Sequence, residues 1–548
     1  MNKDDMLEGL RVEALSSDGC GIAKIDGYPV FIKDALPGDI VTAKVIKAKK
    51  DMSFGRLMSI DKASEDRVAA RCPIARPCGG CAIQELDYDK QLAFKDDKVY
   101  NCLLRIGGIP AKILDAAHEA PIGMDKPWRY RNKAQYPIGR SKDGRIIAGF
   151  YAGCTHHIVE TEECYLNPPE FSVILRTFIR YCEESRIEPY DEITGKGQIR
   201  HLVVRKAFGT DQIMVMPVFR SLSGLDARHR EALKDALIGI PGLMTIVLNE
   251  NHDDTNVILG KRTEILHGPG YIEDRLGEFT FRIGPLSFYQ VNSGLALRLY
   301  EKAMEYADLN GDETVYDLCC GIGTISLFAA KEAGQVFGIE AVPEAIEDAR
   351  INAGLNGIDN VSFTAARVED YLKKKEHFTA DVVILDPPRS GMERSALDAI
   401  VTASPRRIVY ISCDPATQAR DLKVFLAAGY HLARFVTADQ FCQSHHVETV
   451  VLLTQRKPDM SIEITMNEED LELTRAESKA TYKGITDYVQ TKYGLRVPNL
   501  YVAQVKREFG IIERENYNKG KEGHHIPQVP PEKREAIIDA LRFYKMIV

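Results

Sequence analysis

The 548-residue sequence has no run of about 18 consecutive apolar residues, the length that an α-helix needs to cross a bilayer, so we expect no membrane span. Residues 1–6 are acidic and lack the hydrophobic core of a secretory signal, so we expect a cytoplasmic protein. Basic residues are outnumbered: the formal net charge is -8. This balance argues against a uniformly basic surface that binds nucleic acid without selection.

Twelve cysteines are spread over this long chain, which favours reduced thiols, metal ligands or catalytic groups over disulfides. Cys72, Cys78 and Cys81 follow the spacing C-x5-C-x2-C around two glycines, a pattern typical of metal ligands. Cys164 is the best candidate for a fourth ligand, and Cys154 is the alternative. Four thiolates suit either tetrahedral zinc or an iron–sulfur cluster, and the residues alone do not separate the two.

Positive charge is concentrated in two stretches, residues 44–56 and 126–145. In the second stretch the only tryptophan, Trp128, and Tyr130 alternate with arginines. Aromatic rings stack on bases and arginines bind phosphates, so this pattern favours contact with single-stranded RNA. The alternative is a half-exposed strand whose arginines are simply solvated.

Residues 7–60 read as short alternating strands separated by glycine turns, and Asp26-Gly27 between two of them predicts a β-hairpin. This pattern predicts a small closed β-barrel. Residues 18–23 and 31–39 together resemble the TRAM domain, an OB-like barrel. The resemblance implies that this segment binds RNA.

Residues 314–318 read as a buried strand, and the turn that follows contains Gly321 and Gly323 before a helical pattern begins. Glycines at this place let a cofactor approach the backbone where side chains would clash. A second strand, residues 335–339, leads to Glu340, whose carboxylate can accept both hydroxyls of a ribose. A full G-x-G-x-x-G is missing, which disfavours a dinucleotide, so the pattern predicts an α/β domain that binds an adenosyl group.

Two further polar residues belong to the predicted cofactor pocket. A third strand, residues 381–385, leads to Asp386, and the two prolines that follow fix the backbone there. Gln290 has an amide that both donates and accepts, so it can bind cofactor and substrate. Arg389 stands where amino-methylating enzymes with a similar turn carry an aromatic residue, which argues against methylation of an amino group.

Cys413 follows the apolar strand at residues 408–411, at the edge where open α/β sheets bind their ligands. A thiolate is the strongest side-chain nucleophile near neutral pH, although a small buried cysteine is the simpler interpretation. Glu448 leads into another apolar strand, residues 449–453. Partial burial there would raise its pKa and improve it as a base, whereas an isolated glutamate at a strand start is usually exposed.

Together these motifs resemble the RNA uracil-5-methyltransferase family, in particular its 23S ribosomal RNA branch, over residues 7–456. The matching motifs are residues 288–292, 317–323, 386–389, 412–417 and 446–448. The resemblance implies that Cys413 is the nucleophile and Glu448 the general base. It implies S-adenosylmethionine contacts at Gln290, Cys319, Glu340 and Asp386, and it favours a [4Fe–4S] cluster over zinc.

In this family the cysteine adds to carbon 6 of a flipped-out uracil so that carbon 5 can take a methyl group. Cys319 departs from the family, which usually carries an aromatic residue there, so its cofactor contact is expected to be through backbone or apolar atoms. The expected partner of this monomeric chain is 23S ribosomal RNA, with transfer RNA as the alternative. RNA cytosine-5 methylation fits less well because those enzymes use a Pro-Cys motif, whereas Ser412 precedes Cys413. A non-catalytic RNA-binding assembly factor would not need intact Cys413 and Glu448.

Beyond the family core, Thr474 and Glu477 form a capping box that predicts a helix ending at Gly494. Asn499 begins a second predicted helix, and residues 532–544 form a third, giving an accessory RNA contact or a stabilising appendage. The whole chain is therefore predicted to be a multidomain α/β protein. Its parts are a TRAM-like barrel (1–62), a central α+β RNA-binding domain with the metal-site cysteines (63–283), a Rossmann-like class I methyltransferase domain (284–456) and a helical extension (457–548).

Overall fold

The computed structural model describes residues 1–153, 155–374, 379–455, 482–509 and 529–544. Contacts between residues divide the chain into two units, Met1–Pro458 and Asp459–Val548. The domain boundaries predicted inside the first unit remain predictions. Within the described ranges, no helix is both long enough and apolar enough to cross a membrane.

The first strands close into a five-stranded barrel in the order β1-β2-β3-β5-β4, which confirms the predicted TRAM-like barrel. Alternate residues such as Val30 and Ile32 fill its interior. Asp26 and Gly27 both have positive φ between β2 and β3, as the predicted hairpin requires. The strands are β1 (Met6–Leu15), β2 (Gly21–Ile25), β3 (Tyr28–Lys33), β4 (Ile40–Ala48) and β5 (Ser53–Lys62).

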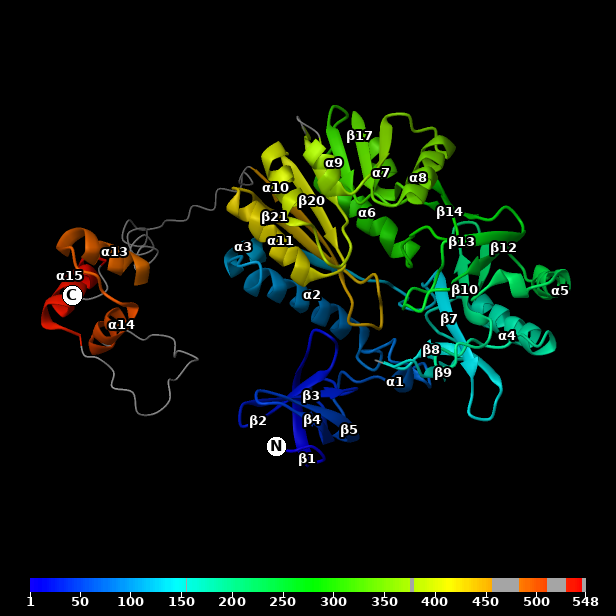
Figure 1. Cartoon of the computed structure of the whole chain (residues 1–548), viewed down its shortest axis with the longest axis horizontal. Helices are drawn as coiled ribbons and strands as arrows, with labels where there is room; N and C mark the ends of the chain where they lie inside the picture. Colours follow the sequence, from blue (N-terminus) through cyan, green and yellow to red (C-terminus); the bar gives the residue numbers. More distant parts are fainter. Residues whose placement is uncertain (154, 375–378, 456–481, 510–528, 545–548) are drawn as a thin grey trace. The chain divides into compact units, whose positions relative to one another are not determined.

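The middle part of the first unit's sequence forms a seven-stranded sheet in the order β13-β12-β11-β10-β7-β8-β9, which we call the central sheet (Figure 1). Its strands are β7 (Lys133–Arg140), β8 (Ile146–Tyr151), β9 (Ile158–Glu160), β10 (Ile199–Lys206), β11 (Ile213–Phe219), β12 (Leu243–Glu250) and β13 (Arg262–His267). Helices α4 (Pro169–Glu184) and α5 (Ala227–Ile238) pack on one face, where Tyr136, Val204 and Leu233 share one apolar core. A short 3-10 turn, η1 (Leu222–Gly224), precedes α5.

The second large sheet has eight strands in the order β18-β17-β16-β19-β20-β22-β21-β6. Strands β16 to β20 run parallel to their neighbours, whereas β22 runs antiparallel to both β20 and β21. The sheet is therefore a doubly wound α/β fold, as predicted. Its strands are β16 (Thr314–Leu318), β17 (Gln335–Glu340), β18 (Val361–Ala365), β19 (Val382–Leu385), β20 (Arg407–Ser412), β21 (His431–Ala438), β22 (Glu448–Thr454) and β6 (His118–Ile122).

Helices cover both faces of this sheet and bury two separate apolar cores. One core contains residues of α6 (Ser293–Ala307), α7 (Thr324–Ala330), α8 (Pro343–Leu355) and the hairpin β14 (Ile272–Leu276) and β15 (Phe279–Ile283). The other contains residues of α2 (Tyr88–Arg105), α3 (Ala111–Ala117), α9 (Val368–Lys374), α10 (Arg394–Ala403) and α11 (Pro415–Ala427). Residues 88–122, which the sequence assigns to the central domain, thus supply two helices and an edge strand to this layer.

The second unit has its own core of small aliphatic side chains, including Ile485, Val502 and Ile537. It contains α13 (Tyr482–Tyr493), α14 (Asn499–Glu508) and α15 (Pro531–Phe543), in good agreement with the predicted helices. The first of these ends at Gly494, whose φ of 70° is the left-handed conformation expected of a helix stop. The predicted capping box at Thr474 lies outside the described residues.

Candidate active site

Cys413 is the first of the two residues between the end of β20 and the start of α11, and Asp414 is the second. Asp414 caps the helix because its Oδ1 accepts the backbone N–H groups of Ala416 at 2.9 Å and Thr417 at 3.1 Å. The Ser412 hydroxyl accepts the Asp414 N–H at 3.1 Å. The strand, the turn and the cap therefore hold the backbone of the half-buried Cys413 in one place.

The pairing of β20 with β22 brings Glu448 to Cys413 from a distant part of the chain. Ser412 lies opposite Thr449 in this antiparallel pair. Cys413 directly follows Ser412, and Glu448, the first residue of β22, directly precedes Thr449. Cys413 and Glu448 are therefore neighbours at the end of the strand pair. Both line one cavity of about 690 Å³, a volume within the usual range of small-molecule sites.

The surroundings of these two side chains disfavour their charged forms. Burial, followed by the negative charge of Glu448, raises the pKa of the Cys413 thiol to about 11, and the neighbouring Arg389 guanidinium opposes this rise. Burial and the Asp386 carboxylate raise the pKa of Glu448 well above its ordinary value. Glu448 is only 3% exposed. An ionised Glu448 would therefore be a strong base, and Arg389 is the group that favours the Cys413 thiolate.

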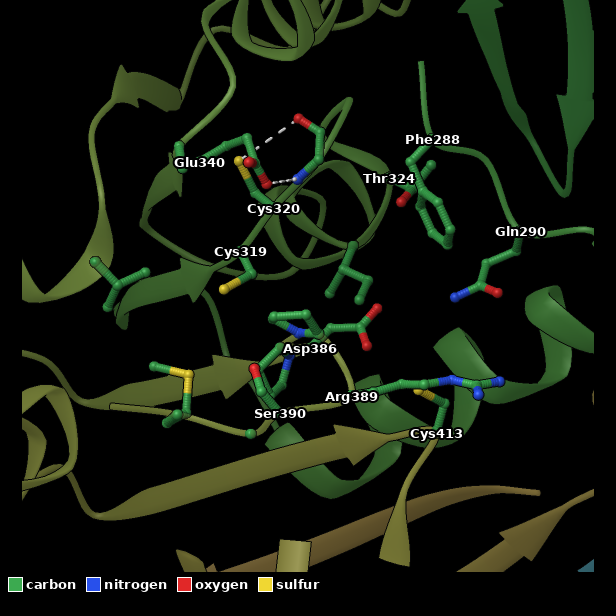
Figure 2. Close-up of a pocket in the computed structure, with 18 of the residues that line it drawn as sticks. Phe288, Gln290, Cys319, Cys320, Thr324, Glu340, Asp386, Arg389, Ser390 and Cys413 are labelled. Atoms are coloured by element: carbon green, nitrogen blue, oxygen red, sulfur yellow. Dashed lines mark hydrogen bonds between the residues drawn. The ribbon is translucent and has the colours of Figure 1, made fainter. Parts of the chain in front are cut away.

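The glycine turn after β16 forms another wall of the cavity. Gly323 has a φ of 82°, which suits glycine, and it immediately precedes α7. The Glu340 carboxylate accepts the Gly321 N–H at 3.2 Å and the Val342 N–H at 3.0 Å, and Figure 2 shows it against this turn. The remaining lone pairs of its two oxygens are free to accept the hydroxyls of a ribose.

Cys319 lines the cavity beside this turn and takes the left-handed conformation with a φ of 75°. Its backbone N–H donates to the Ile339 carbonyl at 2.8 Å. The N–H is thus occupied within the protein, which narrows the expected cofactor contact of Cys319 to its apolar side chain or its carbonyl.

Asp386 and Gln290 project into the same cavity (Figure 2). Burial and the nearby Asp317 carboxylate raise the pKa of Asp386 to about 7. The Gln290 Oε1 accepts from the Gln440 side chain at 3.2 Å, so the Gln290 NH₂ is the group left to donate to a ligand. All six residues predicted from the sequence for catalysis and cofactor binding therefore line one cavity.

Three further residues support this cavity, although the sequence analysis assigned them no catalytic or cofactor-binding role. Arg389 lies beside Cys413 in Figure 2, and Phe288, which is 63% exposed, lies at the rim. Asn132, the residue before β7, donates its side-chain N–H to the Gln290 carbonyl at 2.8 Å. The motif positions of Phe288 and Arg389 pointed to the site, but no local pattern indicated the contact made by Asn132.

The four cysteines predicted as metal ligands, Cys72, Cys78, Cys81 and Cys164, line one small pocket. Burial and the three other thiols raise the pKa of Cys81 to about 12, because a negative charge on Cys81 is disfavoured in an apolar pocket beside other thiols. Among the described residues, no group of three or more His, Cys, Asp or Glu side chains is arranged to hold a single metal ion. The metal site thus remains a prediction, and the alternative ligand Cys154 lies outside the described residues.

Two family models match the chain. The model described as tRNA (Uracil-5-)-methyltransferase matches residues 247–456, and the TRAM domain model matches residues 10–58. The first match spans every strand of the doubly wound sheet except β6 and includes Cys413 and Glu448, and the second spans most of the barrel.

Several relatives are similar to this chain over about four fifths of its length. An uncharacterized RNA methyltransferase of Halalkalibacterium halodurans is 43% identical over 456 residues, which is 83% of this chain and 98% of the relative. An uncharacterized RNA methyltransferase of Bacillus cereus is 42% identical, with 81% of this chain and 95% of the relative covered. The crystal structure of the Pyrococcus abyssi tRNA (uracil-54, C5)-methyltransferase with S-adenosyl-L-homocysteine is 26% identical, with a TM-score of 0.65 over 82% of this chain and 100% of that one.

Proposed function

This chain belongs to the tRNA (uracil-5-)-methyltransferase family, whose members use S-adenosylmethionine to methylate RNA, and we propose that its substrate is a uridine of 23S ribosomal RNA. The observation that carries the proposal is the meeting of Cys413 and Glu448 at the ends of paired strands, inside the cavity that Glu340 and Asp386 also line. This arrangement supplies a nucleophile and a base on one side of a cofactor pocket.

In the proposed reaction, the Cys413 thiolate adds to carbon 6 of the uracil, and the electrons of the ring double bond concentrate on carbon 5. S-adenosylmethionine, once bound, supplies the electrophilic methyl group that carbon 5 takes. The Glu448 carboxylate then removes the proton from carbon 5, and elimination breaks the bond from sulfur to carbon 6 and restores the thiolate. Arg389 stabilises the thiolate before attack and after release, because it is the cation beside Cys413.

We assign cofactor binding to Gln290, Cys319, Glu340 and Asp386. Glu340 would accept the ribose hydroxyls, since its carboxylate is already fixed by two backbone N–H groups. Gln290 would donate through its NH₂ group, because its oxygen is engaged by Gln440. Cys319 would supply an apolar contact. Asp386 would bind a cationic or hydrogen-bonding part of the cofactor.

Ribosomal RNA is favoured over transfer RNA because the barrel and the cysteine set together are features of the ribosomal branch that this sequence resembles. The transfer RNA alternative draws support from the Pyrococcus abyssi neighbour, whose name specifies uracil 54 of transfer RNA. The relatives from Halalkalibacterium and Bacillus are named only as RNA methyltransferases and favour neither.

We also propose that Cys72, Cys78, Cys81 and Cys164 hold a [4Fe–4S] cluster, with zinc as the alternative. All four thiols line one pocket, as a four-thiolate site requires. A single tetrahedral zinc would draw its four sulfurs to within about 3.8 Å of one another. A cluster instead binds each thiolate to a different iron, and the resemblance to the ribosomal branch of the family favours this choice. The cluster would shape the RNA-facing surface, and methyl transfer needs no redox step.

The test of the proposed function is a map of 5-methyluridine in ribosomal and transfer RNA from cells with and without this protein. We expect one or more positions in 23S ribosomal RNA to lose the modification, and purified protein to restore it on the unmodified RNA. Loss from transfer RNA alone would reject the ribosomal substrate. Unchanged maps, together with no transfer in vitro, would reject uracil-5 methylation.

A further inference from the structure

Three cations gather on the face of the central sheet that is opposite to α4 and α5. Lys133 on β7 and Arg205 on β10 are direct cross-strand partners. Arg131 lies two residues before Lys133, just outside β7, and its charge acts on the Lys133 ammonium, so the two cations are close together. Ala134, the residue after Lys133, and its partner Val204 point the other way, into the core beneath α4.

None of these three cations has an anionic partner within the part of the chain that the structure describes. Arg205 is 5% exposed, its Nη2 donates to the Ser287 carbonyl at 2.7 Å, and its buried Nε has no acceptor. Burial and the charges of Arg205 and Arg131 lower the pKa of Lys133 to about 7. No carboxylate or thiol counteracts these effects.

Other cations close by in the sequence do form ion pairs, so the lack of anionic partners is confined to these three residues. Lys206, one residue beyond Arg205, forms ion pairs with Glu170 at 2.9 Å and Asp211 at 3.0 Å. Arg129, two residues before Arg131, is paired with Glu163. Partly buried charges without partners are costly, and such a cost is usually compensated by a ligand of opposite charge.

The cluster lies directly beside the segment that carries the rim of the active-site cavity. Arg205 donates to the carbonyl of Ser287, and Phe288 is the next residue along. Asn132, between Arg131 and Lys133, donates its side-chain N–H to Gln290 and its backbone N–H to Val291, each at 2.8 Å. The cations are therefore tied to the backbone that positions Phe288 and Gln290.

We propose that Arg131, Lys133 and Arg205 form an anion site that binds a backbone phosphate of the substrate RNA next to the flipped uridine. A base can leave its stack only if the strand on either side is held, and phosphate contacts fix that register. The inference rests on the proposed function, since it takes the methylated RNA as the ligand. It adds the place where the strand is held and the groups that hold it.

The test uses a short RNA around the mapped uridine, in which each flanking phosphate is replaced in turn by a neutral methylphosphonate. With the wild-type protein, replacement of the contacted phosphate should raise KM about tenfold, or about 1.4 kcal/mol. Lys133→Gln should raise KM by a similar factor on the all-phosphate RNA and leave kcat nearly unchanged. The same methylphosphonate should then have almost no further effect on the variant, because both changes remove one contact.

Two additional readouts separate binding from structure. The salt dependence of RNA affinity should lose about one unit of slope in Lys133→Gln. Without RNA, the melting temperature of the variant should stay the same or rise, because a like charge is removed. Lys234→Gln is the matched control, since Lys234 lies on α5 across the sheet and pairs with the exposed Glu231. Lys234→Gln should have the wild-type KM and the wild-type salt dependence of RNA affinity.

The proposal is overturned if Lys133→Gln keeps the wild-type KM and salt slope, or if it melts several degrees lower. It is also overturned if the affinity for S-adenosylhomocysteine falls as much as that for RNA, since the anion would then be the carboxylate of the cofactor. Failure of the proposed function has a different outcome: the wild-type protein itself would not methylate the RNA, whichever phosphate is replaced.

Discussion

Lys95 on α2 and Asp439, the residue after β21, form an ion pair from which water is excluded, with exposed side-chain fractions of 0% and 1%. The Lys95 ammonium also donates to the Phe441 carbonyl at 3.1 Å. Asp439 itself donates its N–H to the carbonyl of Ile122 at 2.9 Å. One helix thus anchors the start of the loop that leads into Glu448.

Removal of one partner should leave the other charge buried and unpaired. We expect Lys95→Met to lower the free energy of unfolding by about 3–5 kcal/mol, measured by urea denaturation. Lys331→Met, which breaks the exposed pair between Lys331 and Glu278, should cost less than about 1 kcal/mol. If the two variants lost the same free energy of unfolding, the buried pair would stabilise the protein no more than an exposed pair does.

Substitutions of the two proposed catalytic residues should block the reaction at different steps. Cys413→Ala should lower methyl transfer by about 10⁴-fold or more and form no covalent complex with RNA that carries 5-fluorouridine at the target. Glu448→Gln should accumulate a protein–RNA adduct on unmodified RNA, visible as a band shift in a denaturing gel, because elimination waits for loss of the carbon-5 proton. Cys102→Ala, at a half-buried cysteine of α2, should behave as wild type. Appreciable turnover by Cys413→Ala would reject the covalent route.

The thiol of Cys413 should react faster as pH rises, since its pKa is raised to about 11 and only the thiolate is nucleophilic. Between pH 7 and 10 the alkylation rate of the Cys413 peptide, followed by mass spectrometry, should rise about tenfold per pH unit. Glu448→Gln removes a negative neighbour and should shift this curve to lower pH, whereas Arg389→Met should shift it to higher pH. Cys20 provides the internal control, because burial and Asp18 raise its pKa to about 11 and neither variant touches it.

Cofactor affinity should depend strongly on Glu340 and weakly on Cys319. Glu340→Gln replaces one acceptor oxygen with a donor, so binding of S-adenosylhomocysteine, measured calorimetrically, should weaken at least about tenfold. Cys319→Ala removes only a small apolar contact, because its backbone N–H already donates to Ile339, and should weaken binding by about fivefold or less. A larger loss in Cys319→Ala than in Glu340→Gln would contradict the assigned roles.

The cysteine pocket should carry iron. Protein purified without oxygen should contain about four irons and four sulfides per chain, which is the stoichiometry of a [4Fe–4S] cluster. Cys164→Ser should lose most of this iron, whereas Cys102→Ser should retain it. Zinc without iron in the anaerobic protein would assign the pocket to the alternative metal.

The sequence predicted those parts of the fold that depend on local pattern. The hairpin at Asp26-Gly27 and the strand that ends before Cys413 are examples, since each is specified within a few residues. Strand β6, His118–Ile122, has no hydrophobic run, and only its pairing with β21 makes it a strand. Local pattern therefore did not show that residues 88–122 pack on the second sheet.

The candidate site, like the fold, could be predicted from the sequence where local pattern specifies it. Motifs identified the six residues that line the cavity: five stand at the end of a strand or in a glycine turn, and Gln290 belongs to the motif at residues 288–292. The ion pair of Lys95 with Asp439 and the unpaired cluster around Lys133 join residues that are far apart in sequence, or depend on what is missing nearby. Such relationships arise from tertiary packing, which a single sequence does not display.

The reversed direction of β22 has a consequence for how this enzyme can vary. Cys413 and Glu448 are neighbours because β20 and β22 are antiparallel, so the end of β20 lies beside the start of β22. The register of β22 against β20 therefore determines which side chain of β22 faces the Cys413 thiol. The connection between β21 and β22 is constrained as well, because Asp439, Gln440, Cys442 and Val447 within it are buried. One residue gained or lost inside β22 would turn the carboxyl to the opposite face of the sheet.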